Sequence, residues 1–238
     1  MAGPTTPARA LIAAVRRGLA DRADPARAPQ MQAYMKSTMP YRGVPSPGVR
    51  ALCREVFPAH PLPDRPAWES AVRGLWDDAA YREERYAGIA LTGDRAYAGY
   101  QDPDAMALYE HLVVSGAWWD FVDEVAIRRV GPILLAHPAE VTPVLRAWAR
   151  DDDLWRRRTA IIAQIKAKHA TDLALLDHCV RANLDHRDFF VRKGIGWALR
   201  EYAKTDPAWA RAYVERHRDA MAPLSVREAT KHLGGVSP

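Results

Sequence analysis

The sequence predicts an all-α fold, and three observations lead to this expectation. Apolar residues recur at intervals of three and four along most of the chain, as they do on one face of a helix. No segment alternates apolar and polar residues for as long as a strand would. Short stretches rich in Pro, Asp and Ser separate the periodic segments and offer helix starts and stops. Together they indicate helices of about 10 to 18 residues joined by short links.

The helical segments follow one another from the N-terminus. Residues 1–24 read as an amphipathic helix, semi-independent of the rest, in which Leu11, Val15 and Leu19 share a face. The same periodicity continues in WESAVRGLW, AMALYEHLVV, VTPVLRAWA, LWRRRTAIIAQI, DLALLDHCV, FFVRKGIGWALREYA and WARAYVERH. Residues 234–238 are expected to form a loose tail. No internal linker is evident, so we expect a single domain over residues 1–238.

The succession of helical hairpins favours a curved α-solenoid of HEAT-like antiparallel helix pairs. Such an array has a concave face that suits a long ligand. Sequence repeats are weak, so a compact helical bundle is the alternative. The short links and the steady run of hairpins favour the solenoid.

Composition restricts the function classes. The chain has 238 residues, of which 48% are hydrophobic, and this allows a substantial core. Its formal charge of +5, carried mainly by arginine, mildly favours an anionic partner. Cys53 and Cys179 lack metal-ligand spacing, which suits a reducing cytoplasm. No apolar run approaches the ~18 residues of a membrane span, so no membrane partner is expected.

Several familiar chemistries lack their motifs. The chain has no GxGxxG loop, no P-loop and no HExxH. The histidines are scattered without a ligand pair, and no nucleophile elbow supports Ser-His-Asp hydrolysis. We therefore expect neither a cofactor nor a metal.

The stretch GAWWDFVDEVA brings indoles and carboxylates together. Trp119 and Asp123 are one helical turn apart on the same face. Asp123 also begins the apolar stripe that continues at Ile127, Val130 and Leu134. Ordinary first-turn chemistry explains Asp123 only partly, because an acid near a helix start need not share the buried face.

Ordinary helix chemistry accounts for the other two prominent residues of this stretch. Asp120 is expected to be the N-cap of the helix, since aspartate is among the preferred capping residues. Trp118 is expected to lie in the core.

A second charge interrupts an apolar face in DDDLWRRRTAIIAQIK. Arg158 lies on the stripe of Leu154 and Ile161, whereas Arg156 and Arg157 point elsewhere. A buried guanidinium keeps its charge, so Arg158 needs a carboxylate or phosphate partner. A structural ion pair with one of Asp151 to Asp153 and a functional contact remain equally open.

The segment DFFVRKGIGWALREYAK has two glycines within a helix. Each glycine costs about 1 kcal/mol relative to Ala, so something must approach this backbone closely. A neighbouring helix is the commoner reason and a ligand the other. Phe190, Gly194 and Trp197 lie on one side.

Two further groups of residues could meet nucleic acid. The start of the same helix is basic, which suits either a solvated face or phosphate contacts from Arg187, Arg192 and Lys193. YMKSTMPYRGVPSP mixes aromatic residues and cations around a Pro-Gly turn, namely Tyr34, Lys36, Tyr41 and Arg42. Such a mixture suits nucleic-acid grooves but is weak evidence alone.

These pieces together resemble a known family, the HEAT-repeat alkylpurine DNA glycosylases, or AlkD-type DNA alkylation repair enzymes. The resemblance runs from about residue 30 onward, in the family's order. Its pieces are YMKSTMPYRGVPSP, WWDFVDEVA, LWRRRTAIIAQIKAK, DFFVRKGIGWALREYAKTDP and LSVREATKHL. The most specific are WWDFVDE and IGWALREYAKTDP. The segment Pro45-Ser46-Pro47 falls where the family varies.

The resemblance implies roles for individual residues. The catalytic aspartate falls on Asp123, the active-site tryptophans on Trp119 and Trp197, the catalytic-pocket arginine on Arg158, and the YMK tyrosine on Tyr34. It implies a monofunctional glycosylase of base excision repair that hydrolyses the bond to cationic N3- or N7-alkylated purines and leaves an abasic site. Asp123 would stabilise the oxocarbenium-like sugar and orient water, while Arg158 would grip a phosphate and keep Asp123 ionised.

The expected partner is double-stranded DNA that contains alkylated bases. The protein is expected to be a cytoplasmic monomer, associated with the nucleoid when bound to DNA. Two alternatives remain open. One is a self-resistance glycosylase for a bulky DNA-alkylating natural product. The other is a non-catalytic HEAT-repeat DNA-binding protein, which would have no need of Asp123 facing DNA phosphates.

Overall fold

The computed structural model describes residues 5–233, which contain helices and no strand. The predicted fold class, an all-α solenoid built from helix pairs, is confirmed. The chain divides into two compact units, residues 1–100 and 101–238. The single domain over 1–238 stays a prediction, and the tail at 234–238 lies outside the described residues.

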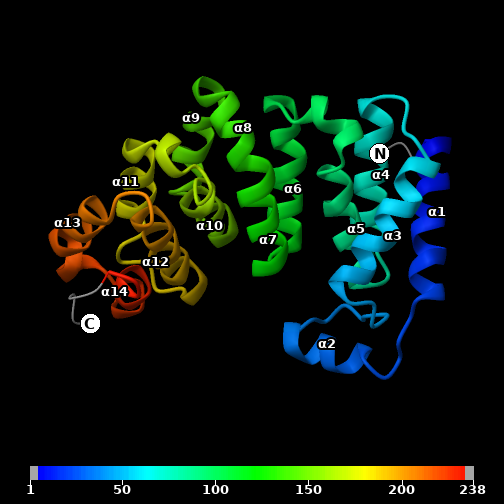
Figure 1. Cartoon of the computed structure of the whole chain (residues 1–238), viewed down its shortest axis with the longest axis horizontal. Helices are drawn as coiled ribbons and strands as arrows, with labels where there is room; N and C mark the ends of the chain where they lie inside the picture. Colours follow the sequence, from blue (N-terminus) through cyan, green and yellow to red (C-terminus); the bar gives the residue numbers. More distant parts are fainter. Residues whose placement is uncertain (1–4, 234–238) are drawn as a thin grey trace. The chain divides into compact units, whose positions relative to one another are not determined.

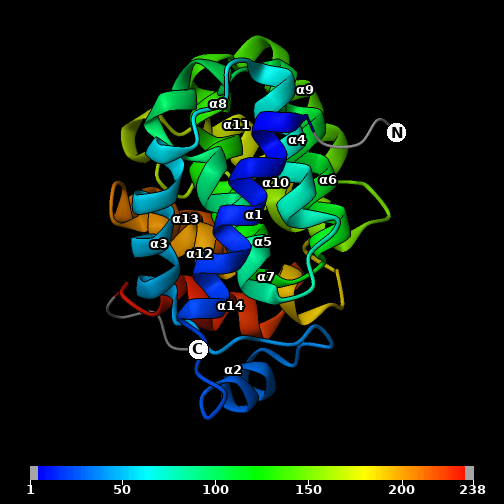
Figure 2. The same cartoon turned by 90° about the vertical axis from the view of Figure 1, so that its right-hand side faces the viewer.

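The first unit is built on four packed helices. α1 packs against α3 and α4, and α5 packs against the same two helices. Figures 1 and 2 show α2 below this group in both views. The elements are α1 (Thr6–Asp21), α2 (Ala28–Met35), α3 (Ser46–Ala59), α4 (Arg65–Trp76), α5 (Arg82–Thr92) and the 3-10 helix η1 (Arg95–Tyr100).

The N-terminal helix belongs to this unit and does not stand apart from it. Leu11, Val15 and Leu19 are fully buried, and α1 packs on α3, α4 and α5. Arg16 also donates to the carboxylate of Glu84 over 2.7 Å, which ties α1 to α5. The amphipathic face predicted for the helix is therefore the face that builds the core.

The loop between α2 and α3 is held by one buried carboxylate. Glu83 of α5 is fully buried and accepts from the backbone N–H groups of Arg42, Gly43 and Val44, at distances of 2.9–3.1 Å. Gly43 has a φ of +86°, and a Cβ there would lie 2.0 Å from the carbonyl oxygen of Asp24. The YRGV sequence is thus a structural motif that fixes this loop.

Gly43→Ala should destabilise the protein. The substitution places a Cβ in a left-handed conformation and against a backbone oxygen, so we expect the free energy of unfolding to fall by about 2 kcal/mol or more. Urea unfolding measures the change. Gly99→Ala is the matched control. A Cβ at position 99 would meet open space, so this variant should unfold with the same free energy as the wild type. Equal unfolding curves for the two variants would contradict this account of the loop.

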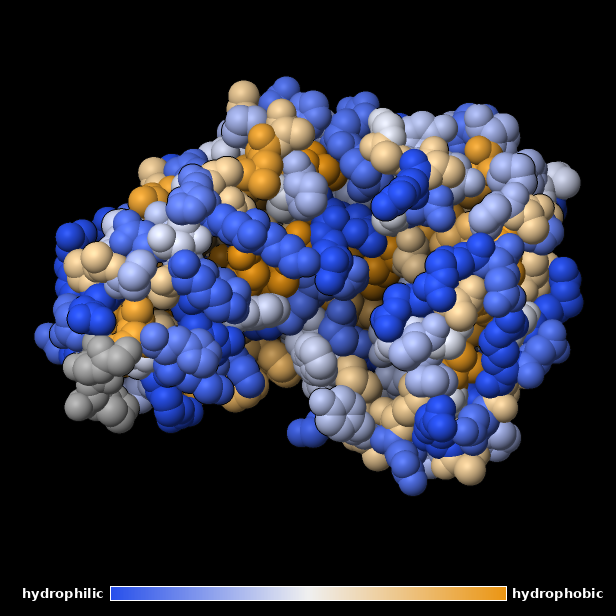
Figure 3. Space-filling model, in the orientation of Figure 1, coloured by the Kyte–Doolittle hydropathy of each residue, from blue (hydrophilic) through white to orange (hydrophobic). Residues whose placement is uncertain are grey.

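The second unit stacks its helices in two rows. In Figure 1, α9, α11 and α13 form one row, and α10, α12 and α14 the other. Figure 3 shows hydrophilic residues over most of this surface, with hydrophobic ones gathered in a hollow near α10. The helices are α6 (Met106–Gly116), α7 (Trp119–Val125), the π-helix η3 (Ala126–Val130), α8 (Gly131–Ala136), α9 (Pro138–Trp148), α10 (Leu154–Ile162), α11 (Leu173–Arg181), α12 (Phe189–Ala203), α13 (Pro207–His217) and α14 (Pro223–Thr230). Short 3-10 turns occupy Pro103–Ala105, Lys168–Ala170 and Arg218–Ala220.

Aspartates cap four helices of the second unit. The side chains of Asp153, Asp172, Asp188 and Asp206 accept from backbone N–H groups in the first turns of α10, α11, α12 and α13. The caps fix where α10 and α12 begin, and so fix the faces of these helices on which Arg158 and Trp197 lie. Among residues 5–233, no helix combines the length and the apolar composition that crossing a bilayer requires.

Candidate active site

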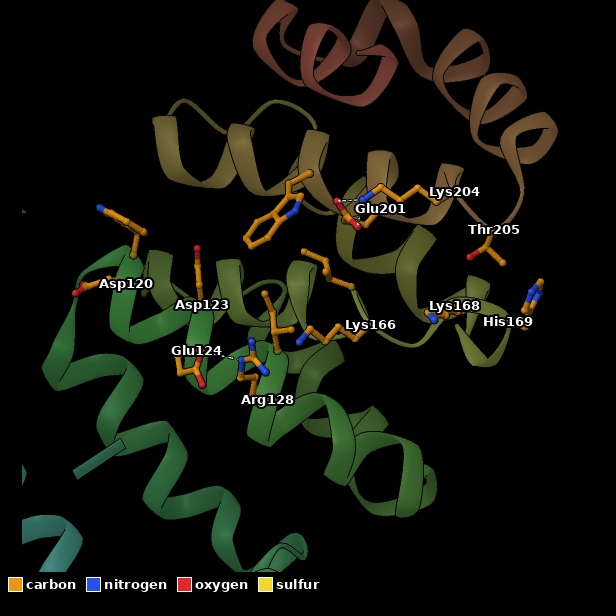
Figure 4. Close-up of a pocket in the computed structure, with 14 residues that line it drawn as sticks. Asp120, Asp123, Glu124, Arg128, Lys166, Lys168, His169, Glu201, Lys204 and Thr205 are labelled. Atoms are coloured by element: carbon orange, nitrogen blue, oxygen red, sulfur yellow. Dashed lines mark hydrogen bonds and ion pairs between the residues drawn. The ribbon is translucent and has the colours of Figure 1, made fainter. Parts of the chain in front are cut away.

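A cavity of about 760 Å³ opens between α7, α12 and the segment that follows α10. Figure 4 shows Asp123 and Glu124 on one wall, with Glu201 and Lys204 on the other. Three of the predicted site residues, Trp119, Asp123 and Trp197, line this cavity. The other residues that line the cavity are Asp120, Glu124, Ile127, Arg128, Ile165, Lys166, Lys168, His169, Glu201, Lys204 and Thr205.

Asp123 and Arg158 form a bidentate ion pair at one side of the cavity. Nε of Arg158 donates to Oδ1 of Asp123 over 2.7 Å, and Nη2 donates to Oδ2 over 2.8 Å. The two side chains are 16% and 5% exposed, for Asp123 and Arg158 respectively. Two parallel bonds fix the plane of the carboxylate as well as its position.

The partner of Arg158 is therefore Asp123, and not one of Asp151 to Asp153. Asp151 instead pairs with Arg156 over 3.1 Å, and Asp153 caps α10. Sequence reasoning placed both Asp123 and Arg158 on buried stripes. It could not pair them, because Asp123 and Arg158 are 35 residues apart in the sequence and lie on different helices.

The remaining nitrogen of the Arg158 guanidinium, Nη1, contacts α12. Nη1 donates to the carbonyl oxygen of Phe190 over 2.5 Å. With Nε and both Nη atoms bonded inside the protein, and the residue 4% exposed, the geometry disfavours the predicted grip on a phosphate. It favours the other predicted role, which is to keep Asp123 ionised.

The two glycines of α12 make room for two different neighbours. A Cβ on Gly194 would lie 3.2 Å from Nη1 of Arg158, tighter than ordinary contact. A Cβ on Gly196 would lie 2.5 Å from Cβ of Glu228, on α14. Gly194 thus admits the guanidinium, and Gly196 admits a neighbouring helix.

Burial raises the pKa of Asp123 above the ordinary value of 3.8. The hydrogen bonds and the charge of Arg158 act in the opposite direction, and the nearby Asp120 carboxylate adds to the rise. Loss of Arg158 would therefore raise the pKa of Asp123 further. The arginine is what favours the ionised form of a carboxyl group that burial works to neutralise.

The start of α7 differs from the prediction at Asp120. The N-cap is Trp118, with extended backbone, and its side chain makes no capping hydrogen bond. Asp120 instead lies in the first turn, where the helix dipole also favours a negative charge, and it lines the cavity. Trp118 is half-buried and packs against Trp155 and Phe190, with ring centroids 6.4 and 5.4 Å away.

Sequence reasoning missed the cations that line the far part of the cavity. Lys166, Lys168 and His169 follow α10 in AQIKAKHATD, and all three are exposed. Lys204 pairs with Glu201 over 2.7 Å, and Arg128 pairs with Glu124 over 3.0 Å. The clustering of cations in KAKH is a signal that could have identified this part. Within residues 5–233, no group of three or more His, Cys, Asp or Glu side chains could hold a metal ion.

The predicted DNA-binding residues of the second unit lie at the start of α12, outside the cavity. Arg187 and Lys193 are exposed and Arg192 is half-buried. Nε of Arg192 donates to the carbonyl oxygen of His186 over 2.7 Å, and Nζ of Lys193 lies 5.6 Å from the centroid of the Phe189 ring.

The remaining predicted DNA-binding residues belong to the first unit. Tyr34 is 78% exposed at the end of α2, and Lys36 follows with a φ of +50°. The Arg42 guanidinium lies over the Tyr81 ring, 3.9 Å from its centroid. Tyr34 is thus free to meet a ligand, whereas Arg42 has its flat face covered.

Comparisons with known proteins converge on one description. Residues 15–233 match the model of a family described as DNA alkylation repair enzyme. A solved structure, described as a predicted DNA alkylation repair enzyme from Enterococcus faecalis, is similar with a TM-score of 0.81 and 27% sequence identity. The match covers 90% of this chain and 98% of that one. No curated protein matches the chain.

Proposed function

This chain belongs to the DNA alkylation repair enzyme family, and we propose that it is a glycosylase acting on alkylated duplex DNA. It would hydrolyse the N-glycosidic bond of purines that carry a positive charge from N3- or N7-alkylation. The observation that carries the proposal is the Asp123 carboxylate, fixed by Arg158 in a cavity that Trp119 and Trp197 also line. The family's role in alkylation repair supplies DNA as the partner.

The proposed reaction needs no protonation of the base. When the bond from C1′ of deoxyribose to N9 breaks, its electron pair neutralises the cationic purine, which leaves. Positive charge then develops on the sugar, and the fixed carboxylate of Asp123 stabilises that charge. Water adds to C1′ and gives up a proton to the carboxylate or to solvent. The product is an abasic site in an otherwise intact strand.

The two tryptophans would complete the recognition of a cation. Trp119 and Trp197 line the same cavity as Asp123 and are each half-buried. An indole face attracts a positive charge, and the attraction is stronger where water is excluded. Indole and carboxylate would therefore act on the same developing charge.

Arg158 would be a positioning residue in this mechanism. It contacts Asp123 and the Phe190 carbonyl, and it does not line the cavity. Its charge favours the ionised carboxylate that the reaction requires. The guanidinium fork also prevents the carboxylate from rotating away from the sugar.

The remaining predicted contacts would hold the duplex. We propose that Tyr34, Lys36, Arg42, Arg187, Arg192 and Lys193 contact the DNA backbone or bases around the lesion. The protein would act as a cytoplasmic monomer that associates with the nucleoid. Lysine and arginine contacts of this kind make affinity depend on salt, because bound cations are released from the DNA.

The pH profile should report the state of Asp123. Because its pKa is raised and its ionised form is the active one, excision should decline on acidification at a pH above the ordinary value of 3.8. Single-turnover release of 7-methylguanine between about pH 4 and about pH 8, corrected for spontaneous depurination, measures the decline. No loss on the alkaline side is expected from a general acid. A profile without an acid limb in this range would count against Asp123 as the essential carboxylate.

A panel of single-lesion duplexes tests the proposal and its rivals. Duplexes with 7-methylguanine, 3-methyladenine or a bulky N3-adenine adduct are each incubated with the protein, with and without borohydride. We expect release of the methylated purines and no borohydride-trapped protein–DNA adduct. Release of the bulky adduct alone would indicate a self-resistance glycosylase. Binding of every duplex without release would indicate a non-catalytic DNA-binding protein.

A further inference from the structure

A second concavity of the second unit lies between α9 and α11. Its volume is about 410 Å³. We call it the arginine pocket, after its lining residues Arg146, Arg150, Ala174, Asp177, His178, Arg181 and Ala182. None of these described residues lines the cavity around Asp123. α10 packs against α9 and α11 as well as against α7 and α12, so it stands between the two concavities.

The charges in the arginine pocket do not balance. Three guanidinium groups face one carboxylate, that of Asp177. Oδ1 of Asp177 accepts from the Tyr213 hydroxyl over 3.0 Å, and Oδ2 lies 3.7 Å from Nη1 of Arg181. Within residues 5–233, the guanidinium groups of Arg146 and Arg150 have no hydrogen-bond or ion-pair partner.

Two neighbouring arginines, by contrast, have side-chain partners. Arg156 bonds to Asp151 and pairs with Glu110 over 2.9 Å. Nη1 of Arg157 donates to Oδ1 of Asn183 over 3.0 Å. Arg146 lies in the last turn of α9 and Arg150 follows four residues later, just beyond the end of the helix, so their like charges repel each other. The C-terminal ends of helices favour cations, which allows both to remain there without a counter-ion.

We propose that the arginine pocket binds a phosphate group. Guanidinium groups match phosphate oxygens through paired N–H donors, and several of them converge here on one hollow. The lining residues Ala174 and Ala182 are small and leave the hollow open. Nε2 of His178 lies 3.3 Å from the carbonyl oxygen of Arg146, to which it donates, so the ring borders the arginines without neutralising them.

The phosphate could come from two sources. One is the backbone of a DNA segment other than the segment at the Asp123 cavity, since the arginine pocket has its own lining. The other is a small phosphorylated molecule. The recognition chemistry is the same for both, and the experiment distinguishes them.

The test compares the wild type with Arg146→Gln/Arg150→Gln. Inorganic phosphate is titrated into each protein while the backbone amide signals of Ala174 and Ala182 are followed by NMR. We expect saturable shifts in the wild type and a loss of affinity of about tenfold or more in the double variant. The control is Arg227→Gln/Lys231→Gln, which removes the same charge from exposed positions and should behave as the wild type. Thermal unfolding of all three proteins verifies that they fold.

A DNA arm identifies the source. The affinity for a lesion-free duplex is measured against salt concentration. If DNA occupies the pocket, the double variant should lower the slope of log affinity against log salt by about 2. An unchanged slope with lost phosphate shifts would identify a small phosphorylated ligand. Identical phosphate titrations and slopes in all three proteins would overturn the proposal. Neither arm requires base excision, so the result is independent of the proposed glycosylase activity.

Discussion

Asp123→Asn is expected to lower the rate of 7-methylguanine release from methylated duplex DNA by about 100- to 1000-fold. The substitution keeps the size of the side chain and removes the charge that would stabilise the cationic sugar. It also converts one acceptor facing Arg158 into an amide, so the fork of two charge-assisted bonds cannot form. Single-turnover release under excess protein measures the effect without a contribution from product dissociation.

Asp152→Asn is the matched control for this experiment. Asp152 is exposed and does not line the cavity, so the same chemical change there should leave the release rate unaltered. Affinity for the duplex is measured in parallel for both variants. Wild-type release by Asp123→Asn would remove Asp123 from the proposed mechanism, whatever its effect on binding.

Arg158→Ala is expected to reduce the free energy of unfolding by about 3 to 5 kcal/mol. The reason is that Arg158 is buried and its removal leaves two buried acceptors without their donors. These are the Asp123 carboxylate, 16% exposed, and the carbonyl of Phe190. Urea unfolding at neutral pH measures the loss. Arg158→Lys should recover only part of it, because an ammonium group cannot form the same fork.

Arg156→Ala provides the comparison on the same helix. The ion pairs of Arg156 with Asp151 and Glu110 are partly exposed, so its removal should cost no more than about 1 kcal/mol. Acidification of the Arg158→Ala protein should narrow the difference from the wild type, since protonation of Asp123 removes the unpaired charge. If Arg158→Ala and Arg156→Ala lost equal free energies of unfolding, the stabilising role assigned to the buried Arg158–Asp123 pair would be wrong.

Sequence patterns located the two residues at the centre of the candidate site. Asp123 and Arg158 each interrupted an apolar stripe, which signals a buried charge in need of a partner. Helix periodicity holds within a helix, so these positions could be predicted. The pairing between α7 and α10 depends on how the helices pack, and periodicity carries no information about that.

Other features were beyond local patterns for similar reasons. The cap of α7 was assigned to Asp120 because aspartate is a preferred N-cap, but the N-cap is Trp118, two residues earlier. The YRGV loop was grouped with nucleic-acid motifs, because nothing nearby in sequence reveals that Glu83 of α5 binds its backbone. In both cases contacts between residues distant in sequence determine the local structure, and a local motif does not reveal them.

The measurement that tests the central claim most directly is the identification of what the wild-type protein releases from alkylated DNA. A duplex methylated on its purines is incubated with excess protein, the free bases are identified by mass spectrometry, and abasic sites are counted in the same sample. The account predicts free 7-methylguanine and 3-methyladenine in amounts equal to the abasic sites, with Asp123→Asn releasing neither above the spontaneous background. Tight binding of the duplex with every alkylated base still attached would contradict it.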